Sequence, residues 1–221
     1  MWTRGMLPLV TTDATSLVYR LPSVLDVERR CVALAMLDAI LSPEWEYRYY
    51  SFNRYWDRAR NQRMGSFRDG CGDEYFILFS SDAVASIKGF DHEAFDGRSV
   101  KGVLDGIPDA FADFKNEPAF DMEHITFCLW NAGRGWQRSG ALADGIIAKD
   151  GSASMLGLLV GTPADYTEYA RDNFEIAVSA RVVARFFTLE KLTSALAASL
   201  RHDVDLTQIE NIDEIGYPCS S

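Results

Sequence analysis

The sequence contains no apolar run of the about 18 residues that a membrane-spanning helix requires. Its opening segment, Met1 to Met6, lacks the apolar stretch that is typical of a secretory signal. The four cysteines are scattered, with neither a Cys-x-x-Cys pair nor a histidine at zinc-finger spacing. We therefore expect a cytoplasmic protein with reduced thiols, and we predict no metal site, no cofactor and no membrane contact.

Positive charge is also scarce in this chain. Lys and Arg together number 22 against 32 Asp and Glu, which gives a net charge of -10 with neutral histidines. Nucleic acids and anionic membranes are polyanions, so a chain this acidic is a poor non-specific ligand for either. Its 221 residues, 48% of them hydrophobic, are enough for a packed core. We predict a single domain over residues 1–221, with a loop or soft seam at 133–151.

The motifs of several common enzyme classes are missing as well. The sequence has no GxxxxGK[ST] phosphate loop, no GxSxG nucleophile elbow and no HExxH zinc helix. The run Gly133-Arg134-Gly135 is not followed by the third glycine of a dinucleotide-binding fingerprint. We therefore favour a function without catalysis and keep an unusual enzyme class as the alternative.

Strand patterns fill the middle of the sequence. The continuous apolar run Tyr75 to Phe79 predicts a strand that is covered on both faces. Residues 84–90 alternate apolar and polar side chains, as strands with two different faces do. Further strands are predicted at 46–52, 64–68 and 124–130. Together these segments predict an antiparallel meander sheet over about residues 46–130.

Helical patterns lie at both ends. Ser23 is a suitable cap for a helix over 24–41, which is apolar nearly all round and so is expected to be central. Thr162-Pro163-Ala164-Asp165 is a helix start signal. A leucine stripe over 189–200 predicts an amphipathic helix, and a short helix is expected at 107–115. The fold class is therefore α+β, with the meander packed against N- and C-terminal helices.

A polar turn follows the strand predicted at 64–68. Its glycines, in Asp69-Gly70-Cys71-Gly72-Asp73, can adopt positive φ without a Cβ clash. One interpretation is a polar site at the mouth of the sheet, with Arg68 held between carboxylates. The other is turn chemistry, in which Asp side chains bind backbone N–H groups and Arg68 pairs across the hairpin. We prefer the turn.

A second polar cluster, Asp91-His92-Glu93, follows the strand at 84–90. These residue types serve as metal ligands or as acids and bases. Neighbours on a strand point to opposite faces, so the three converge only if the chain turns there, and we prefer a solvated strand end. We assign no catalytic residue and no metal ligand. The candidate binding residues of the two clusters are Arg68, Asp69, Asp73, Glu74, Asp91, His92 and Glu93.

The segment from Trp45 to Arg68 combines aromatic residues with arginines and has a local charge of +4 inside an acidic chain. This composition occurs at protein interfaces and on single-stranded nucleic-acid platforms. The plainer interpretation, which we prefer, is that the aromatics are core and the arginines pair with carboxylates. Among the functional interpretations a protein interface ranks above nucleic acid. The exposed face of Tyr47 to Trp56 could also form a homodimer seam.

The block Gly65 to Phe79, GSFRDGCGDEYFILF, resembles a family of uncharacterised bacterial proteins that share a GSxRDGxGDEYFxLF-like block. In those proteins the block is followed, in the same order, by segments like Glu117 to Phe120 and Thr126 to Trp130. The resemblance spans about Pro43 to Pro218 and implies kinship without an established activity, so it transfers no catalytic residue. In size and acidity the chain also resembles bacterial immunity proteins.

We predict an acidic protein-binding module, most concretely an immunity or antitoxin-like protein that blocks a basic partner. Acids between Asp69 and Asp96 would steer the partner, and nearby aromatics would anchor it. The alternative is a hydrolase-like or metal-dependent enzyme. That alternative requires Arg68, Asp73, Asp91 and His92 to converge in one pocket.

Overall fold

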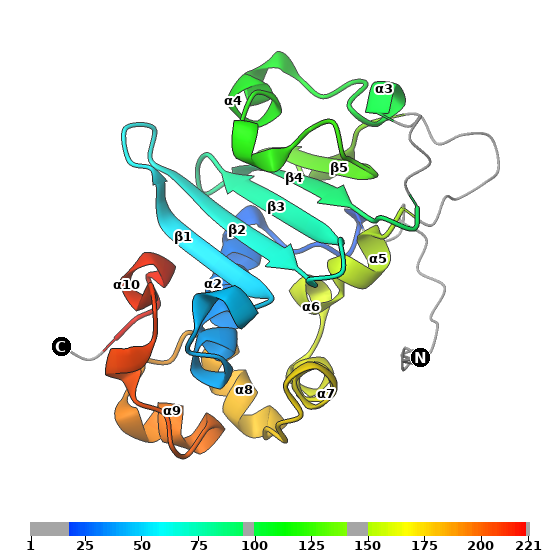
Figure 1. Ribbon diagram of the computed structural model, residues 1–221. Coiled ribbons are helices and arrows are strands. Elements are labelled where there is room, and N and C mark those ends of the chain that lie inside the picture. The colour runs from blue at the N-terminus through cyan, green and yellow to red at the C-terminus, as the bar shows by residue number, and fades with distance from the viewer. Residues whose placement is uncertain (1–17, 95–99, 141–149, 220–221) are drawn as a thin grey trace.

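A six-stranded antiparallel sheet in the order β1-β2-β3-β4-β5-β6 forms the centre of the molecule (Figure 1). The computed structural model describes residues 18–94, 100–140 and 150–219. Each strand pairs with the next in the chain, so the predicted α+β meander is confirmed. The strands are β1 Tyr50–Asp57, β2 Gln62–Arg68, β3 Glu74–Phe79, β4 Val84–Phe90, β5 Phe127–Ala132 and β6 Trp136–Arg138.

Helices and short 3-10 turns connect and cover these strands. The α-helices are α2 Val24–Leu41, α3 Val100–Val103, α4 Ala112–Lys115, α5 Ser152–Met155, α6 Gly157–Val160, α7 Pro163–Phe174, α8 Ala180–Phe187, α9 Ser194–Leu200 and α10 Ile212–Ile215. The 3-10 turns are η1 Trp45–Tyr47, η2 Asp109–Phe111, η3 Pro118–Phe120 and η4 Leu206–Gln208. Of the predicted seam at 133–151, residues 141–149 lie outside the described residues, and 136–138 form β6.

One face of the sheet, the inner face, packs on α2 and the helices around it (Figure 1). The start of α2 is fixed as predicted, because Ser23 Oγ accepts the Asp26 N–H at 3.2 Å. Tyr75, Ile77 and Phe79 of β3 project to this side and are almost completely buried. Since α2 is itself buried nearly all round, it is the central helix that its sequence indicates.

A buried carboxyl joins α2 to the sheet. Asp38 is fully buried and accepts the backbone N–H groups of Tyr49 and Tyr50, at 3.2 and 2.9 Å, and the Tyr166 hydroxyl at 2.8 Å. Burial raises the pKa of Asp38 to about 7, although these hydrogen bonds oppose the shift. One side chain thereby ties α2, the start of β1 and α7 together.

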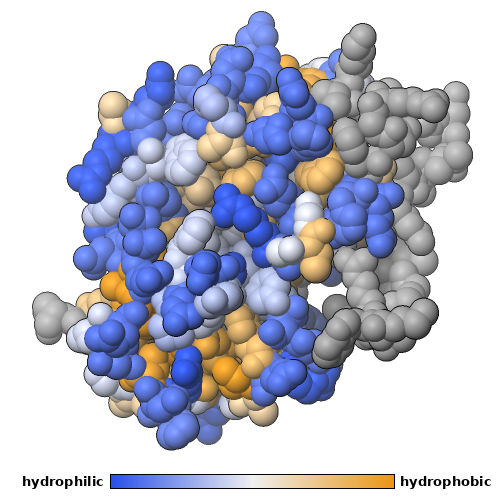
Figure 2. Space-filling model, viewed as in Figure 1, coloured by the Kyte–Doolittle hydropathy of each residue, from blue (hydrophilic) through white to orange (hydrophobic). Residues whose placement is uncertain are grey.

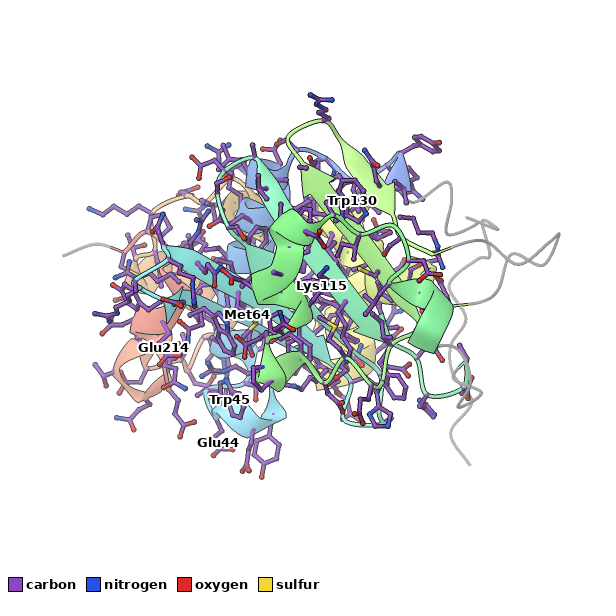
Figure 3. The ribbon with its side chains drawn as sticks, turned by 90° about the horizontal axis from the view of Figure 1, so that it is seen from above. Glu44, Trp45, Met64, Lys115, Trp130 and Glu214 are labelled. Carbon is purple, nitrogen blue, oxygen red and sulfur yellow. The ribbon has the colours of Figure 1, made fainter. Side chains whose placement is uncertain are left out.

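The opposite, outer face of the sheet is only partly covered. Ile107, Phe111, Phe114 and Phe120 from the segment 107–125 pack on it. They meet a second apolar cluster on the sheet, made of Met64, Phe76, Leu78 and Cys128. Figure 3 shows this segment lying over the centre of the sheet. Residues of β1 and β2 are left at the floor of a cavity.

Two expectations about local structure were wrong. The strand predicted from residue 46 begins at Tyr50, because residues 45–47 form η1. The helix predicted over 189–200 begins at Ser194, where the Thr193 hydroxyl accepts the Leu196 N–H. Leu189 has φ 53°, a left-handed conformation that interrupts a helix. Leu192 instead forms a bridge with Cys219.

Candidate functional site

The predicted turn between β2 and β3 is organised by Asp69. Its Oδ1 accepts the backbone N–H groups of Cys71 and Asp73, at 2.8 and 2.9 Å. Gly70 and Gly72 have φ of 73° and 121°, which a residue with a Cβ rarely adopts. The preferred interpretation of this block as turn chemistry is confirmed for Asp69.

Asp73 and His92 form a pair at the same end of the sheet. Asp73 Oδ1 accepts the His92 backbone N–H at 3.0 Å and lies 2.7 Å from His92 Nδ1. The carboxylate is buried, whereas the side chain of His92 is 43% exposed. The hydrogen bond with Asp73 raises the pKa of His92. A histidine oriented in this way can take up a proton, which is the first requirement of a general base.

The other members of the second cluster belong to a turn. Asp91 Oδ1 accepts the backbone N–H groups of Glu93 and Ala94, at 3.0 and 2.9 Å. Among residues 18–94, 100–140 and 150–219, no group of three His, Cys, Asp or Glu side chains could hold a metal ion. The acidic cluster therefore shapes the end of β4.

A chain of three charged side chains lies on the outer face. Lys88 of β4 has no exposed side-chain surface, and its Nζ lies 2.7 Å from Glu74 Oε1 of β3. Glu74 also faces Arg68 of β2, at 3.9 Å between Oε2 and Nε. Burial lowers the pKa of Lys88, and Glu74 opposes that shift. The predicted pairing of Arg68 across the hairpin is present, but its carboxylate is shared with a buried lysine.

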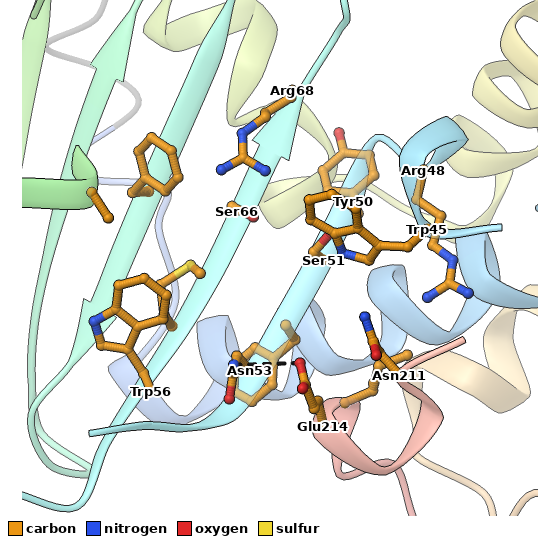
Figure 4. Close-up of a pocket in the computed structure, with 15 residues that line it drawn as sticks. Trp45, Arg48, Tyr50, Ser51, Asn53, Trp56, Ser66, Arg68, Asn211 and Glu214 are labelled. Carbon is orange, nitrogen blue, oxygen red and sulfur yellow. Dashed lines mark hydrogen bonds between the residues drawn. The ribbon is translucent and has the colours of Figure 1, made fainter. Parts of the chain in front are cut away.

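A cavity of about 200 Å³ opens beside Arg68 on the β1–β2 half of the outer face. Its floor includes Ser51 and Ser66, which are paired across β1 and β2. Figure 4 shows Trp45 and Trp56 on either side of these serines, with Arg68 at one end. We call this cavity the outer groove.

The helix α10 closes the other end of the outer groove. Asn53 of β1 donates from Nδ2 to Glu214 Oε2 at 3.4 Å, as drawn in Figure 4. Arg48 also lines the groove, but its guanidinium donates to the backbone carbonyls of Ser42, Pro43 and Glu210. Arg48 therefore fixes η1 against the chain before α10 and is not available for a ligand.

Exposed aromatics and acids meet at the rim of this groove. Trp45 and Tyr47 of η1 are 44% and 60% exposed. The Trp45 backbone N–H donates to Glu210 Oε2 at 2.8 Å, which brings the C-terminal acids beside η1. Figure 3 shows Glu44, Trp45 and Glu214 on the same side of the molecule. We call the set the acidic aromatic patch; it consists of Glu44, Trp45, Glu46, Tyr47, Glu210 and Glu214.

The field at this patch is negative. A hydrogen bond with the Glu46 carboxylate, together with the charges of Glu46 and Glu44, raises the pKa of the Tyr47 hydroxyl. Within the described residues, the four glutamates of the patch form no ion pair with a lysine or arginine. Figure 2 shows that hydrophilic side chains predominate on much of one face of the molecule. The patch differs from such a surface because two large aromatic side chains lie exposed among the acids.

The predicted site residues are thus divided between different structures. Asp69, Asp73, Asp91 and His92 belong to turns, while Arg68 lines the outer groove. A second cavity lies between α2 and the β1–β2 turn. None of the four turn residues lines this cavity or the outer groove.

The acidic aromatic patch was not predicted from the sequence. The sequence analysis places Trp45 and Tyr47 in an aromatic and basic segment and does not connect them with Glu210 and Glu214. The local signal that could have joined them is the pair of glutamates, Glu44 and Glu46, flanking Trp45 in a segment whose arginines lie further along.

All four cysteines are free thiols; Cys31 and Cys128 are buried, and Cys71 and Cys219 are exposed. Burial raises the pKa of Cys128 to about 11 and raises that of Cys31 further. The buried thiols therefore behave as small apolar side chains. In the described part of the chain, no helix combines the length and the apolar character needed to cross a membrane.

Comparison with known proteins gives no relative: no protein-family model, no curated protein and no solved structure matches the chain. The resemblance of the Gly65 to Phe79 block to a bacterial family remains a prediction.

Proposed function

We propose that this protein is a binding module for a basic protein partner, and that the acidic aromatic patch is its docking surface. The observation that carries the proposal is the exposure of Trp45 and Tyr47 among four glutamates that form no ion pair with a lysine or arginine in the described residues. Tryptophan and tyrosine supply large contact areas at protein interfaces. Unpaired acids around them attract and orient a positively charged surface.

The net charge of -10 supports the same partner chemistry. A long-range negative field accelerates the encounter with a basic protein, and the local acids then fix its orientation. This docking surface differs from the one expected from the sequence, in which the acids between Asp69 and Asp96 steer the partner. Asp69, Asp73 and Asp91 are used in turns, so they are less suited to contact a partner.

The most concrete form of the proposal is an immunity or antitoxin-like function. Proteins that act on nucleic acids carry basic clefts, because their substrates are polyanions. An acidic surface with two aromatic anchors can occupy such a cleft and exclude the substrate. The inhibition would then require no catalytic residue of this chain.

The test is affinity capture from the native host with the full chain, followed by native mass spectrometry. We expect a basic protein in stoichiometric amount, and we expect the variant Glu44→Lys/Glu46→Lys to lose it. The control, Asp105→Lys/Glu123→Lys, makes the same change in net charge at exposed acids outside the patch and should retain the partner.

Salt provides a second criterion for the same complex. Since charges at the rim are screened by salt, capture should weaken as ionic strength rises from about 0.05 M to about 0.5 M. Equal capture by the patch variant and the control variant, or a captured protein that is acidic, would contradict the proposal.

A further inference from the structure

The outer groove has features that a protein-docking surface does not require, beginning with its floor. Ser66 is 4% exposed, and its partner across the strands is Ser51. Both line the groove, and neither hydroxyl makes a hydrogen bond with another described residue. Ser66 is buried and Ser51 is half-buried, so two hydroxyls in one cavity are free to donate hydrogen bonds to a ligand that can accept them.

A cation lies next to these hydroxyls. Arg68 follows Ser66 by two residues on β2, so both side chains project to the same face of the sheet. The Arg68 side chain is 45% exposed, and its guanidinium carbon lies 5.0 Å from the centre of the Phe76 ring. Lys88 lies 2.7 Å from a Glu74 oxygen and also faces Asp121, whereas Arg68 approaches Glu74 only to 3.9 Å, so the Arg68 guanidinium is the less tightly paired of the two cations.

The walls of the groove are aromatic. Trp56 stacks on Phe120 with ring centres 5.9 Å apart, and Phe120 stacks on Phe76 at 5.1 Å. Trp45 lies on the other side of the serine pair (Figure 4). A volume of about 200 Å³ exceeds the about 150 Å³ of a cavity that holds one benzene ring. The groove is therefore suited to a flat ligand of one aromatic ring with a polar group.

We propose that the outer groove binds a small aromatic monocarboxylate, with the carboxylate on Arg68, Ser51 and Ser66 and the ring between Trp45 and Trp56. A carboxylate matches the single charge of the half-exposed Arg68 guanidinium, whereas a dianion would also face the carboxylates of Glu74 and Glu214. At the opposite end Glu214 can accept a hydrogen bond from a hydroxyl or amino group on the ring. This site goes beyond the proposed protein-binding function and does not depend on it.

The test is calorimetric titration of the purified protein with benzoate and 4-hydroxybenzoate, with three related compounds as references. Benzyl alcohol removes the charge, benzylamine reverses it and phenyl phosphate doubles it. We expect benzoate to bind at least about tenfold more tightly than benzyl alcohol and benzylamine, because a charge-assisted hydrogen bond contributes about that factor. We expect 4-hydroxybenzoate to bind more tightly than benzoate.

The variant Arg68→Gln should weaken benzoate binding by about tenfold or more, and Ser66→Ala by a smaller factor. Arg181→Gln, at an exposed position on α8, is the control and should leave binding unchanged. Should Arg68→Gln not fold, Ser51→Ala/Ser66→Ala tests the same anion site without removing a charge. Thermal unfolding of each variant separates lost binding from lost structure.

The proposal is overturned if benzoate binds no better than benzyl alcohol, if the Arg68 variant binds benzoate as the wild type does, or if phenyl phosphate binds more tightly than benzoate. The variant Glu44→Lys/Glu46→Lys, which abolishes partner capture in the proposed function, should retain benzoate binding. The two proposals can therefore fail separately.

Discussion

The buried polar groups on the two faces of the sheet differ in their surroundings. On the inner face, Asp38 is enclosed by hydrogen-bond donors from β1 and α7. On the outer face, the charges run from the buried Lys88 through Glu74 to the half-exposed Arg68, beside serine hydroxyls that bind no other described residue. The inner group connects elements of the fold. The outer groups lead to a cavity, so we assign structure to the inner face and recognition to the outer one.

The largest expected effect comes from breaking the outer charge chain. Glu74→Ala removes the only carboxylate within ion-pair distance of Lys88 in the described residues and leaves the buried ammonium with only the more distant Asp121 as a counter-charge. We expect the free energy of unfolding to fall by about 3 kcal/mol. Urea denaturation measures the loss.

The double variant Glu74→Ala/Lys88→Met is the control for that prediction. It removes the buried charge together with its partner, so most of the lost stability should return. A double variant as unstable as Glu74→Ala would show that Glu74 acts through packing and not through Lys88.

Asp38, the buried carboxyl of the inner face, should make the free energy of unfolding depend on pH. Because the folded pKa of Asp38 is raised to about 7, the stability it contributes is full below the unfolded pKa of about 3.9 and is lost as pH rises through about 7. Asp38→Asn imitates the protonated side chain and does not titrate. The variant should therefore gain stability relative to the wild type with rising pH, by at most about 1.4 kcal/mol per pH unit.

Urea denaturation of both proteins at several pH values, from about pH 4 to about pH 8, measures this difference. A constant difference between the two proteins over that range would mean that Asp38 titrates alike in the folded and unfolded chains. The same pH series on Tyr166→Phe, which removes one donor to Asp38, tests whether the hydroxyl acts through the carboxyl.

A smaller effect is expected at the β2–β3 turn. Asp69→Ala removes the acceptor for two backbone N–H groups, those of Cys71 and Asp73, and should cost about 1 kcal/mol. Asp69→Asn keeps an acceptor oxygen and should cost less than about 0.5 kcal/mol. Thermal unfolding compares the two variants. Equal losses would mean that the charge of Asp69 matters and the turn hydrogen bonds do not.

Local sequence signals predicted much of the inner face. Ser23 and Asp26 marked the start of α2, and the alternation at 84–90 marked β4 with its bounds. The failure at Leu189 has a physical reason, since a leucine stripe carries no sign that one leucine will adopt a left-handed conformation. Periodicity placed β4 correctly, whereas the helix expected at 107–115 is a 3-10 turn followed by a four-residue helix, and the strand expected at 124–130 begins at Phe127.

The outer face was harder to predict, because its features depend on long-range contacts. The alternation at 84–90 predicted that Lys88 and Ile87 point to opposite faces of the sheet. The complete burial of Lys88 depends on the segment 107–125, which covers the outer face. The acidic aromatic patch joins η1 to Glu210, which lies more than 160 residues further along the chain. No local sequence pattern indicates that residues 107–125 cover the outer face or that η1 contacts Glu210.

The smallest expected effect on stability belongs to the patch itself. Trp45 and Tyr47 are exposed, so Trp45→Ala/Tyr47→Ala should change the free energy of unfolding by less than about 1 kcal/mol. The same substitutions remove both aromatic anchors from the proposed docking surface.

The most direct test of the account measures both properties of this one variant, its unfolding in urea and its capture of a basic partner from the native host. We predict nearly unchanged stability with loss of the partner that the wild type captures. A variant that loses several kcal/mol of stability while it still captures the partner would show that these aromatics serve the fold, and would contradict the assignment of recognition to the outer face.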